Sequence, residues 1–133
     1  MYEMKKLSIV VIDDSPIIRK RIKDMLDESK TVKHLFMAED FSKGVALIDK
    51  HNPEVVLLDI NLPDGRGLKN LYELKRTSPE TKVIIITNQE HEKYEQVSMQ
   101  LGAYCYLDKS YDFHKLPSVI EQISRAHGSY FSA

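Results

Sequence analysis

The chain has 133 residues, of which 42% are hydrophobic and 29% are charged, and this length suits one compact domain around one hydrophobic core. Its 19 basic and 20 acidic residues give a formal net charge of -1, and no basic run is longer than "RKRIK" at 19–23. We therefore do not expect direct binding of nucleic acid through a basic surface.

The cysteine content and the N-terminal segment bear on the compartment. The single cysteine, Cys105, excludes an internal disulfide, and no Asn-x-Ser/Thr signal is present. The opening segment "MYEMKKLSIVVIDD" lacks the long apolar region of a signal peptide. No apolar run approaches the roughly 20 residues needed to cross a bilayer. We expect a soluble, cytoplasmic protein that does not associate with membranes.

Five short apolar runs along the chain predict β-strands. Three of these runs are continuously apolar and rich in valine and isoleucine, which is typical of strands covered on both faces. In chain order the predicted strands are Leu7–Ile12, Lys33–Ala38, Glu54–Leu58, Lys82–Ile86 and Ala103–Leu107.

Between these runs, apolar residues recur at helical spacing and predict five amphipathic helices. In chain order the stripes are Ile18, Ile22, Met25 and Leu26; Phe41, Val45 and Ile48; Leu68, Leu71 and Tyr72; Tyr94, Val97 and Leu101; and Leu116, Val119, Ile120 and Ile123. Ser15 with Pro16, Asp40 and Asp112 are predicted to open the first, second and last helices. The fourth stripe is the weakest, because its other positions are polar.

The regular alternation of strands and helices predicts an α/β fold. Five repeats of strand and helix favour a doubly wound, five-stranded parallel sheet with right-handed crossovers and helices on both faces. The flavodoxin-like strand order 2-1-3-4-5 is the common solution for five strands. No repeat, linker or low-complexity segment interrupts the pattern, so we expect a single domain over 1–133 with no output domain.

Polar side chains follow four of the five predicted strands, at the sheet edge where such folds carry their functional sites. Asp13 and Asp14 follow the first strand, Asp59 the third and Thr87 the fourth, and Lys109 lies just past the fifth. Three neighbouring carboxylates resist ionising together unless a cation offsets their repulsion. A hard divalent ion such as Mg²⁺ meets that need and leaves room for a phosphoryl oxygen.

The stretch "VVLLDINLPDGRG", 55–67, singles out one of these acids. A buried strand delivers Asp59 to the sheet edge, and the chain then turns at once through Pro63, Gly65 and Gly67. A carboxylate can act as a nucleophile toward phosphorus, and phosphoryl transfer needs mainly positioning and charge neutralisation. Each residue alone also fits ordinary turn chemistry or a solvated surface. The combination makes Asp59 the candidate nucleophile.

Four motifs resemble those of a known family. The segments "VVIDDS", "LLDINLPDGRG", "IIITN" and "YCYLDKS" are similar to those of chemotaxis-regulator-like receiver domains of two-component response regulators, over roughly Lys5 to Ala126. The resemblance implies a phosphorylation switch, with Mg²⁺-dependent transfer from a phosphohistidine to Asp59 and later hydrolysis. The donor would be a sensor histidine kinase or a histidine phosphotransfer protein. Such a protein would catalyse only its own phosphorylation and dephosphorylation.

The resemblance also implies which residues bind the metal ion. Asp14 and Asp59 would bind Mg²⁺ directly, and Asp13 would act largely through water. The backbone carbonyl of Asn61, two residues past the phosphoacceptor, would be the third protein ligand. The downstream partner, a homodimer and the question of a longer parent protein stay open at this point.

Three further residues would complete the switch, and two positions depart from the family's pattern. Thr87 would hydrogen-bond the phosphoryl group, Tyr106 would rotate with it, and Lys109 would pair with a phosphoryl oxygen. Asn88 stands where the family prefers a small residue, and we expect it to narrow access to the site, with an outward turn that caps the following helix as the alternative. Ser110 stands where the family prefers proline, often with a cis bond. We expect a trans Lys109–Ser110 peptide, because a cis bond before a residue other than proline costs about 3 to 4 kcal/mol.

Ile17 and the segment "HEKYE" prompt separate hypotheses. Ile17 falls off the first helical stripe and lies one turn from the acids, so we expect it to contact the phosphodonor protein, with packing under a neighbouring loop as the alternative. "HEKYE" places His91 and Glu95 on one helical face, as in zinc hydrolases, but it lacks their second histidine. A receiver-like module that is never phosphorylated is the main alternative function. Flavin binding by the same fold also stays open, whereas the glycine spacing does not fit nucleotide-binding loops.

Overall fold

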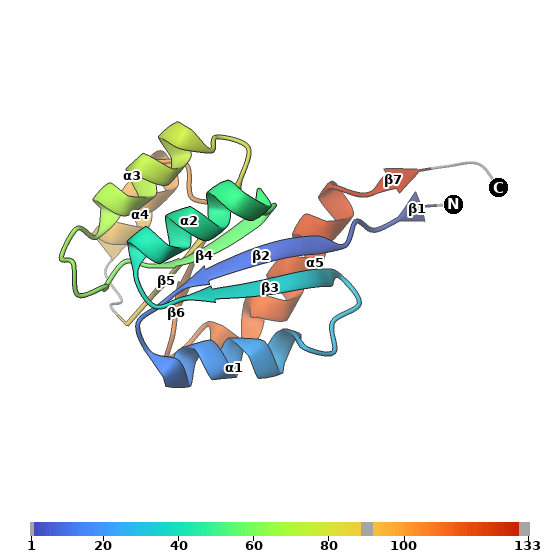
Figure 1. The fold of residues 1–133 in the computed structure, drawn as a ribbon, viewed down its shortest axis with the longest axis horizontal. Coiled ribbons are helices and arrows are strands. Elements are labelled where there is room, and N and C mark those ends of the chain that lie inside the picture. The colour runs from blue at the N-terminus through green and yellow to red at the C-terminus, as the bar shows by residue number, and fades with distance from the viewer. Residues whose placement is uncertain (1, 89–91, 131–133) are drawn as a thin grey trace.

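The computed structural model describes residues 2–88 and 92–130. Its centre is a sheet of five parallel strands in the spatial order β3-β2-β4-β5-β6 (Figure 1). The strands are β2 (Leu7–Ile12), β3 (Val32–Ala38), β4 (Val55–Asp59), β5 (Lys82–Thr87) and β6 (Cys105–Asp108). Counted along the chain, this order is 2-1-3-4-5, and the predicted flavodoxin-like fold is confirmed.

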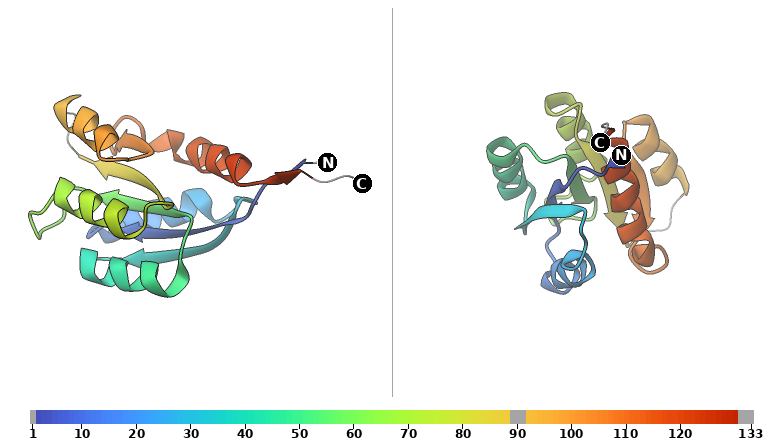
Figure 2. Two further views of the ribbon diagram at one scale, coloured as in Figure 1. Left: turned by 90° about the horizontal axis from the view of Figure 1, so that it is seen from above. Right: turned by 90° about the vertical axis from the view of Figure 1, so that its right-hand side faces the viewer.

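Five α-helices cover the two faces of this sheet (Figures 1 and 2). They are α1 (Pro16–Leu26), α2 (Phe41–His51), α3 (Leu68–Thr77), α4 (Glu92–Gln100) and α5 (Leu116–Ala126), with a 3-10 turn, η1 (Phe113–Lys115), before the last helix. None of the helices in the described parts of the chain has the length and apolar character needed to cross a bilayer.

The sheet separates two apolar clusters because successive strand residues point to opposite faces. Along β2, Ile9 and Val11 join α1 and α5 in one cluster, and Val10 and Ile12 join α2 and α3 in the other. The four strand residues are fully buried. A strand covered on both sides is apolar at nearly every position, and β2 departs from this only at Ser8.

The predicted helix starts are correct for the first two helices and only approximate for the last. The hydroxyl of Ser15 accepts from the Ile18 amide, and the carboxylate of Asp40 accepts from the Lys43 amide. Asp112 instead precedes η1 and makes no side-chain cap there, and α5 begins at Leu116. The carboxylate of Asp112 accepts from the amide of Asp108 and pairs with Lys115 instead.

The predicted stripes of α3 and α4 are partly wrong. Tyr72 is 58% exposed, and α3 buries Leu71 and Leu74 together with Asn70. On α4, Tyr94 is exposed and the buried residue is Ser98, whose hydroxyl donates to the Tyr94 carbonyl. The helical period of apolar residues is weak in α4 because polar residues lie between its apolar positions.

A two-stranded antiparallel sheet, which the sequence analysis did not predict, joins the two ends of the described chain. Strands β1 (Tyr2–Glu3) and β7 (Ser129–Tyr130) pair with each other. Beside them, the Lys5 amide donates to the Ser124 carbonyl and the Ser124 hydroxyl donates to the Lys5 carbonyl. These contacts lie at the amino ends of the parallel strands, opposite the carboxyl ends of those strands (Figure 1).

Candidate functional site

The carboxyl ends of four parallel strands bring the predicted site residues to one edge of the sheet. Asp59 ends β4 and Thr87 ends β5, while Asp13 and Lys109 directly follow β2 and β6. The strands are in register there, because Ile12 pairs with Leu58 and Asp59 pairs with Ile86. The rigid sheet therefore fixes the positions of side chains that lie far apart in the sequence.

Three carboxylates form a cluster that suits a metal ion. Asp13, Asp14 and Asp59 each offer an oxygen atom, and these atoms lie within 4.8 Å of one another. Asp13 and Asp59 are buried, whereas Asp14 is exposed. Within the described part of the chain, the Asp14 carboxylate makes no hydrogen bond or ion pair, so its oxygens are available. This set of oxygen donors, partly open to solvent, fits Mg²⁺.

A buried lysine links two of these acids. The ammonium nitrogen of Lys109 lies 2.7 Å from Asp13 Oδ2 and 3.2 Å from Asp59 Oδ2, and the lysine side chain is only 5% exposed. Burying charges is costly unless they are paired closely. If Lys109 moved away from the two carboxylates, buried charges would be left unpaired. Because this is energetically costly, the lysine is held in place.

Both oxygens of the Asp59 carboxylate have a donor. Oδ2 accepts from Lys109, and Oδ1 accepts from the amide of Asn61 at 2.8 Å. Burial raises the pKa of Asp59 above its ordinary value and Asp13 adds to the rise, while the Asn61 amide and Lys109 oppose it. The two donors therefore orient a carboxylate whose surroundings, on balance, resist its negative charge.

One carboxylate oxygen and the backbone carbonyl of Asp13 both accept hydrogen bonds within the protein. Its Oδ1 atom accepts from the Ser15 amide at 2.8 Å, and its backbone carbonyl accepts from the Arg19 guanidinium at 2.7 Å. Its Oδ2 atom contacts Lys109 as an ion pair but has no hydrogen-bond partner among the described residues. Asp13 is thus anchored through Oδ1 and its backbone carbonyl, while the hydrogen-bonding capacity of Oδ2 is unused within this part of the chain.

The Asn61 side chain joins the loop after β4 to the end of β5. Its Oδ1 atom accepts from the Thr87 hydroxyl at 2.8 Å and from the backbone amide of Asn88 at 3.2 Å. Thr87 is fully buried, whereas Asn61 and Asn88 are exposed. The sequence analysis considered only the carbonyl of Asn61 and missed this amide contact, for which the sequence carries no signal.

The loop after Lys109 is held by a residue that the sequence analysis did not single out. Asp108 is buried, and its Oδ1 accepts from the amides of Ser110 at 2.7 Å and Tyr111 at 3.1 Å. The Lys109–Ser110 peptide is trans, as predicted. Proline has no amide hydrogen, so serine at position 110 supplies a donor that the family's usual residue lacks. The pattern Asp-x-Ser is a recognisable signal for such a turn.

The turn after Asp59 depends on glycine. Gly65 and Gly67 have φ angles of 68° and 54°, a backbone region in which residues with a Cβ atom are strained. The buried Asn70 of α3 donates to the Asp64 carboxylate at 3.0 Å and ties the turn to the helix.

Tyr106, the predicted rotating aromatic, is half-buried against the cluster beneath α2 and α3.

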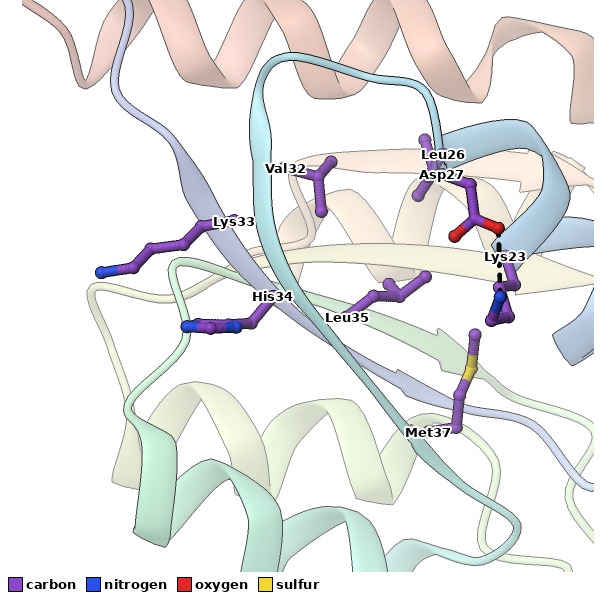
Figure 3. Close-up of a pocket in the computed structure, with 8 residues that line it drawn as sticks. All are labelled: Lys23, Leu26, Asp27, Val32, Lys33, His34, Leu35 and Met37. Atoms are coloured by element: carbon purple, nitrogen blue, oxygen red, sulfur yellow. Dashed lines mark hydrogen bonds and ion pairs between the residues drawn. The ribbon is translucent and has the colours of Figure 1, made fainter.

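Two other regions do not contribute to this cluster. Of the zinc-like segment, His91 lies outside the described residues, and Glu95 is an exposed residue of α4. A hollow between α1 and the edge strand β3 is shown in Figure 3. Its floor is largely apolar, and its acid, Asp27, is paired with Lys23 at 3.0 Å. Unlike the sheet edge, where the Asp14 carboxylate is unpaired within the described residues, this hollow therefore offers no free carboxylate.

The fold and this edge of the sheet define a class of α/β protein with a buried carboxylate at the end of the central strand, a nearby acidic pair, a buried lysine and a hydroxyl. Residues 9–121 match the family model of the response regulator receiver domain. The chain belongs to this family, whose members are phosphorylation switches of two-component signal transduction.

Curated relatives and solved structures agree with this assignment. The chain is 30% identical to the transcriptional regulatory protein DegU of Brevibacillus brevis over 94% of its length, but it covers only 52% of DegU. It is 28% identical to the protein CcdB of Bacillus subtilis, covering 90% of this chain and 97% of CcdB. The chain thus spans about half the length of the first relative and almost all of the second.

A solved structure supports the fold independently. The signal receiver domain of a DNA-binding response regulator from Colwellia psychrerythraea superposes with a TM-score of 0.82. The alignment covers 89% of this chain and 98% of that one, at 21% identity. At this level of identity the similarity supports the fold and says nothing about individual residues.

Proposed function

We propose that Asp59 is the phosphoacceptor of this receiver and that roughly Lys5 to Ala126 form its functional core. The observation that carries the proposal is the position of Asp59 at the end of the central strand, with Lys109 3.2 Å from one carboxylate oxygen and two further acids beside it. A chain with this set of side chains has the groups needed for phosphoryl transfer.

The residues present also support a role for Mg²⁺. Asp14, Asp59 and the backbone carbonyl of Asn61 would bind the ion, and Asp13 would contact it largely through water. Bound Mg²⁺ would neutralise the negative charge that gathers on the transferring phosphoryl group. Asp14 is the accessible member of the acidic cluster, which favours it as a direct ligand.

The reaction would proceed in two steps. The phosphorus–nitrogen bond of a donor phosphohistidine breaks as an oxygen of Asp59 bonds to phosphorus, and the electron pair stays with the imidazole. Later, water adds to phosphorus, inorganic phosphate leaves and the Asp59 carboxylate is restored. Lys109 would offset charge on a phosphoryl oxygen, Thr87 would donate a hydrogen bond to another, and Tyr106 would change position with Thr87.

The donor would be a sensor histidine kinase or a histidine phosphotransfer protein, acting in the cytoplasm. The protein would catalyse no reaction other than its own phosphorylation and dephosphorylation. The downstream partner is a protein in this proposal, because the balanced charge of the chain does not favour direct contact with nucleic acid.

The proposal is tested by phosphate-affinity electrophoresis after incubation with acetyl phosphate and Mg²⁺. We expect a shifted band for the wild type and none for Asp59→Asn, with Asp64→Asn as a control for an acid in the adjacent turn. A shifted band in Asp59→Asn would refute the assignment of the phosphoacceptor. No shift in any variant would favour a receiver-like interaction module that is not phosphorylated.

A further inference from the structure

The side-chain amide oxygen of Asn61 links the loop after β4 to the end of β5. It accepts hydrogen bonds from two groups at the end of β5, the Thr87 hydroxyl at 2.8 Å and the Asn88 backbone amide at 3.2 Å. The backbone amide of the same residue donates to Asp59 at 2.8 Å. One residue thus contacts both the proposed phosphoacceptor and the proposed switch hydroxyl.

The Thr87 hydroxyl and the Asn88 backbone amide can each donate only one hydrogen. While the Thr87 hydrogen is donated to Asn61, it cannot be donated to a phosphoryl oxygen. Phosphorylation of Asp59 must therefore exchange one acceptor for another at this hydroxyl.

We infer that the Asn61 side chain is a built-in competitor of the phosphoryl group, which holds the Thr87 hydroxyl and the Asn88 amide in the unphosphorylated protein. This inference rests on the proposed role of Asp59 and Thr87. The side-chain amide is a neutral acceptor, and a phosphoryl oxygen is a charged and stronger one. Replacing Asn61 by a phosphoryl oxygen as the acceptor is thus favourable overall. The free-energy gain is reduced, however, by the free energy of the hydrogen bonds to Asn61 that are lost.

The position of Thr87 makes these bonds significant. Thr87 is fully buried, and a buried hydroxyl that loses an acceptor becomes less stable. Removing the Asn61 amide therefore destabilises the unphosphorylated state and leaves the phosphorylated state, in which this bond is already broken, nearly unchanged. The equilibrium between the two states then shifts toward the phosphorylated form.

The test uses beryllofluoride, a stable mimic of the phosphoryl group, with saturating Mg²⁺. We expect Asn61→Ala to bind beryllofluoride about threefold to tenfold more tightly than the wild type by calorimetric titration. The affinity for Mg²⁺ alone is measured in parallel for each variant, so that a change in metal binding is told apart from a change in beryllofluoride binding. A general loosening of the loop would instead weaken both affinities.

Two more variants separate hydrogen bonding from added space. Asn61→Leu keeps the volume of the side chain and removes the acceptor, so it should also bind beryllofluoride more tightly. In a Thr87→Ala background, Asn61→Ala should have a smaller effect than in the wild type, because the main donor is already missing. An effect of equal size in both backgrounds would overturn the inference.

The remaining outcomes are also decisive. If the wild type binds beryllofluoride and Asn61→Ala binds it equally or less tightly, the competition by Asn61 is refuted while the phosphoacceptor site stands. If Ala tightens binding and Leu does not, the side chain acts by filling space, and the inference is again refuted. If the wild type binds no beryllofluoride with Mg²⁺, the proposed function itself fails.

Discussion

Asp14 differs from the other two acids of the cluster because it is exposed and, within the described residues, unpaired. Asp13 and Asp59 both contact Lys109, so their charges are already partly offset in the absence of a metal ion. The charge on Asp14 has no such partner. Of the three carboxylates, it is therefore the one best placed to gain from a bound cation.

We expect Asp14→Ala to weaken Mg²⁺ binding by about tenfold or more, since even indirect supports of a metal site contribute about this much. Mg²⁺ keeps few protein ligands and tolerates little distortion of its geometry. Calorimetric titration with Mg²⁺ measures the change, and Asp49→Ala, an exposed acid of α2, is the control. An unchanged titration in Asp14→Ala would refute the assignment of this ligand.

Asn88 is exposed and follows Thr87 directly. We expect a polar side chain there to narrow the path of the phosphodonor and the hydrolytic water and to hold water away from productive geometry. We predict that Asn88→Ala increases both the rate of phosphorylation by acetyl phosphate and the rate of dephosphorylation. The backbone amide that donates to Asn61 is retained in this variant. If neither rate increases, Asn88 does not restrict access.

The first helix presents an apolar residue to solvent near the acids. Ile17 is 78% exposed, which contradicts the alternative that it packs under a neighbouring loop. A single exposed isoleucine is ordinary on a protein surface, so it is the position of Ile17 near the acids that makes it a candidate contact for a partner protein.

We predict that Ile17→Ala slows phosphotransfer from the cognate kinase by about fivefold, which corresponds to the loss of one useful contact at an interface. Its phosphorylation by acetyl phosphate should not change, because the small donor makes no contact with α1. Tyr72→Ala, which removes an exposed apolar residue of α3, is the matched control. Equal transfer from the kinase to Ile17→Ala and the wild type would contradict the docking role.

The second helix, α2, approaches strand β2 closely at a glycine. A Cβ atom on Gly44 would lie 2.3 Å from Cδ1 of Ile12, a fully buried residue. We expect Gly44→Ala to lower the free energy of unfolding by about 1 to 3 kcal/mol, as overpacking does in other cores. Urea denaturation measures this change. Ser42→Ala, at an exposed position of the same helix, should have little effect, and an unchanged Gly44→Ala would show that Ile12 has room to move.

Among the secondary-structure elements, the strand bounds and helix caps that depend on a local residue pattern were the features that the sequence predicted. The β2 run was predicted with its exact bounds because all of its residues except Ser8 are apolar, and the caps at Ser15 and Asp40 were found because they follow a simple rule. The β1–β7 pair was missed because two-residue strands carry no periodicity. The strand ends predicted the meeting of Asp13, Asp59 and Lys109, but the contact of Asn61 with Thr87 depends on a loop conformation that no spacing encodes.

At the scale of the whole molecule, the buried carboxylate that is proposed to accept the phosphoryl group also lowers the stability of the fold at neutral pH. Burial raises the pKa of Asp59, so the folded protein binds a proton at this carboxyl more tightly than the unfolded chain does. Its contribution to stability is then largest at low pH and is lost as the pH rises from the ordinary aspartate value through the raised one. At neutral pH the charged form costs stability.

We therefore predict that Asp59→Asn melts a few degrees higher than the wild type at neutral pH without Mg²⁺, because the amide carries no charge. The difference should shrink as the pH is lowered toward the ordinary pKa of aspartate. Added Mg²⁺ should raise the melting temperature of the wild type more than that of the variant, since ligand binding to the folded state is stabilising. Calorimetry at several pH values tests both trends, and a wild type that melts higher than Asp59→Asn at neutral pH would contradict the first.

The pairing of β1 with β7 has a practical consequence for engineering. Because the backbones of Tyr2 and Tyr130 are partners in this small sheet, a short glycine-rich segment could connect the two strands. New ends could then be opened at the exposed Pro79–Glu80 turn before β5, which lies at the edge of the sheet away from Asp59. The result would be a circular permutant that keeps the acceptor edge intact and can carry a reporter protein at a new place on the receiver.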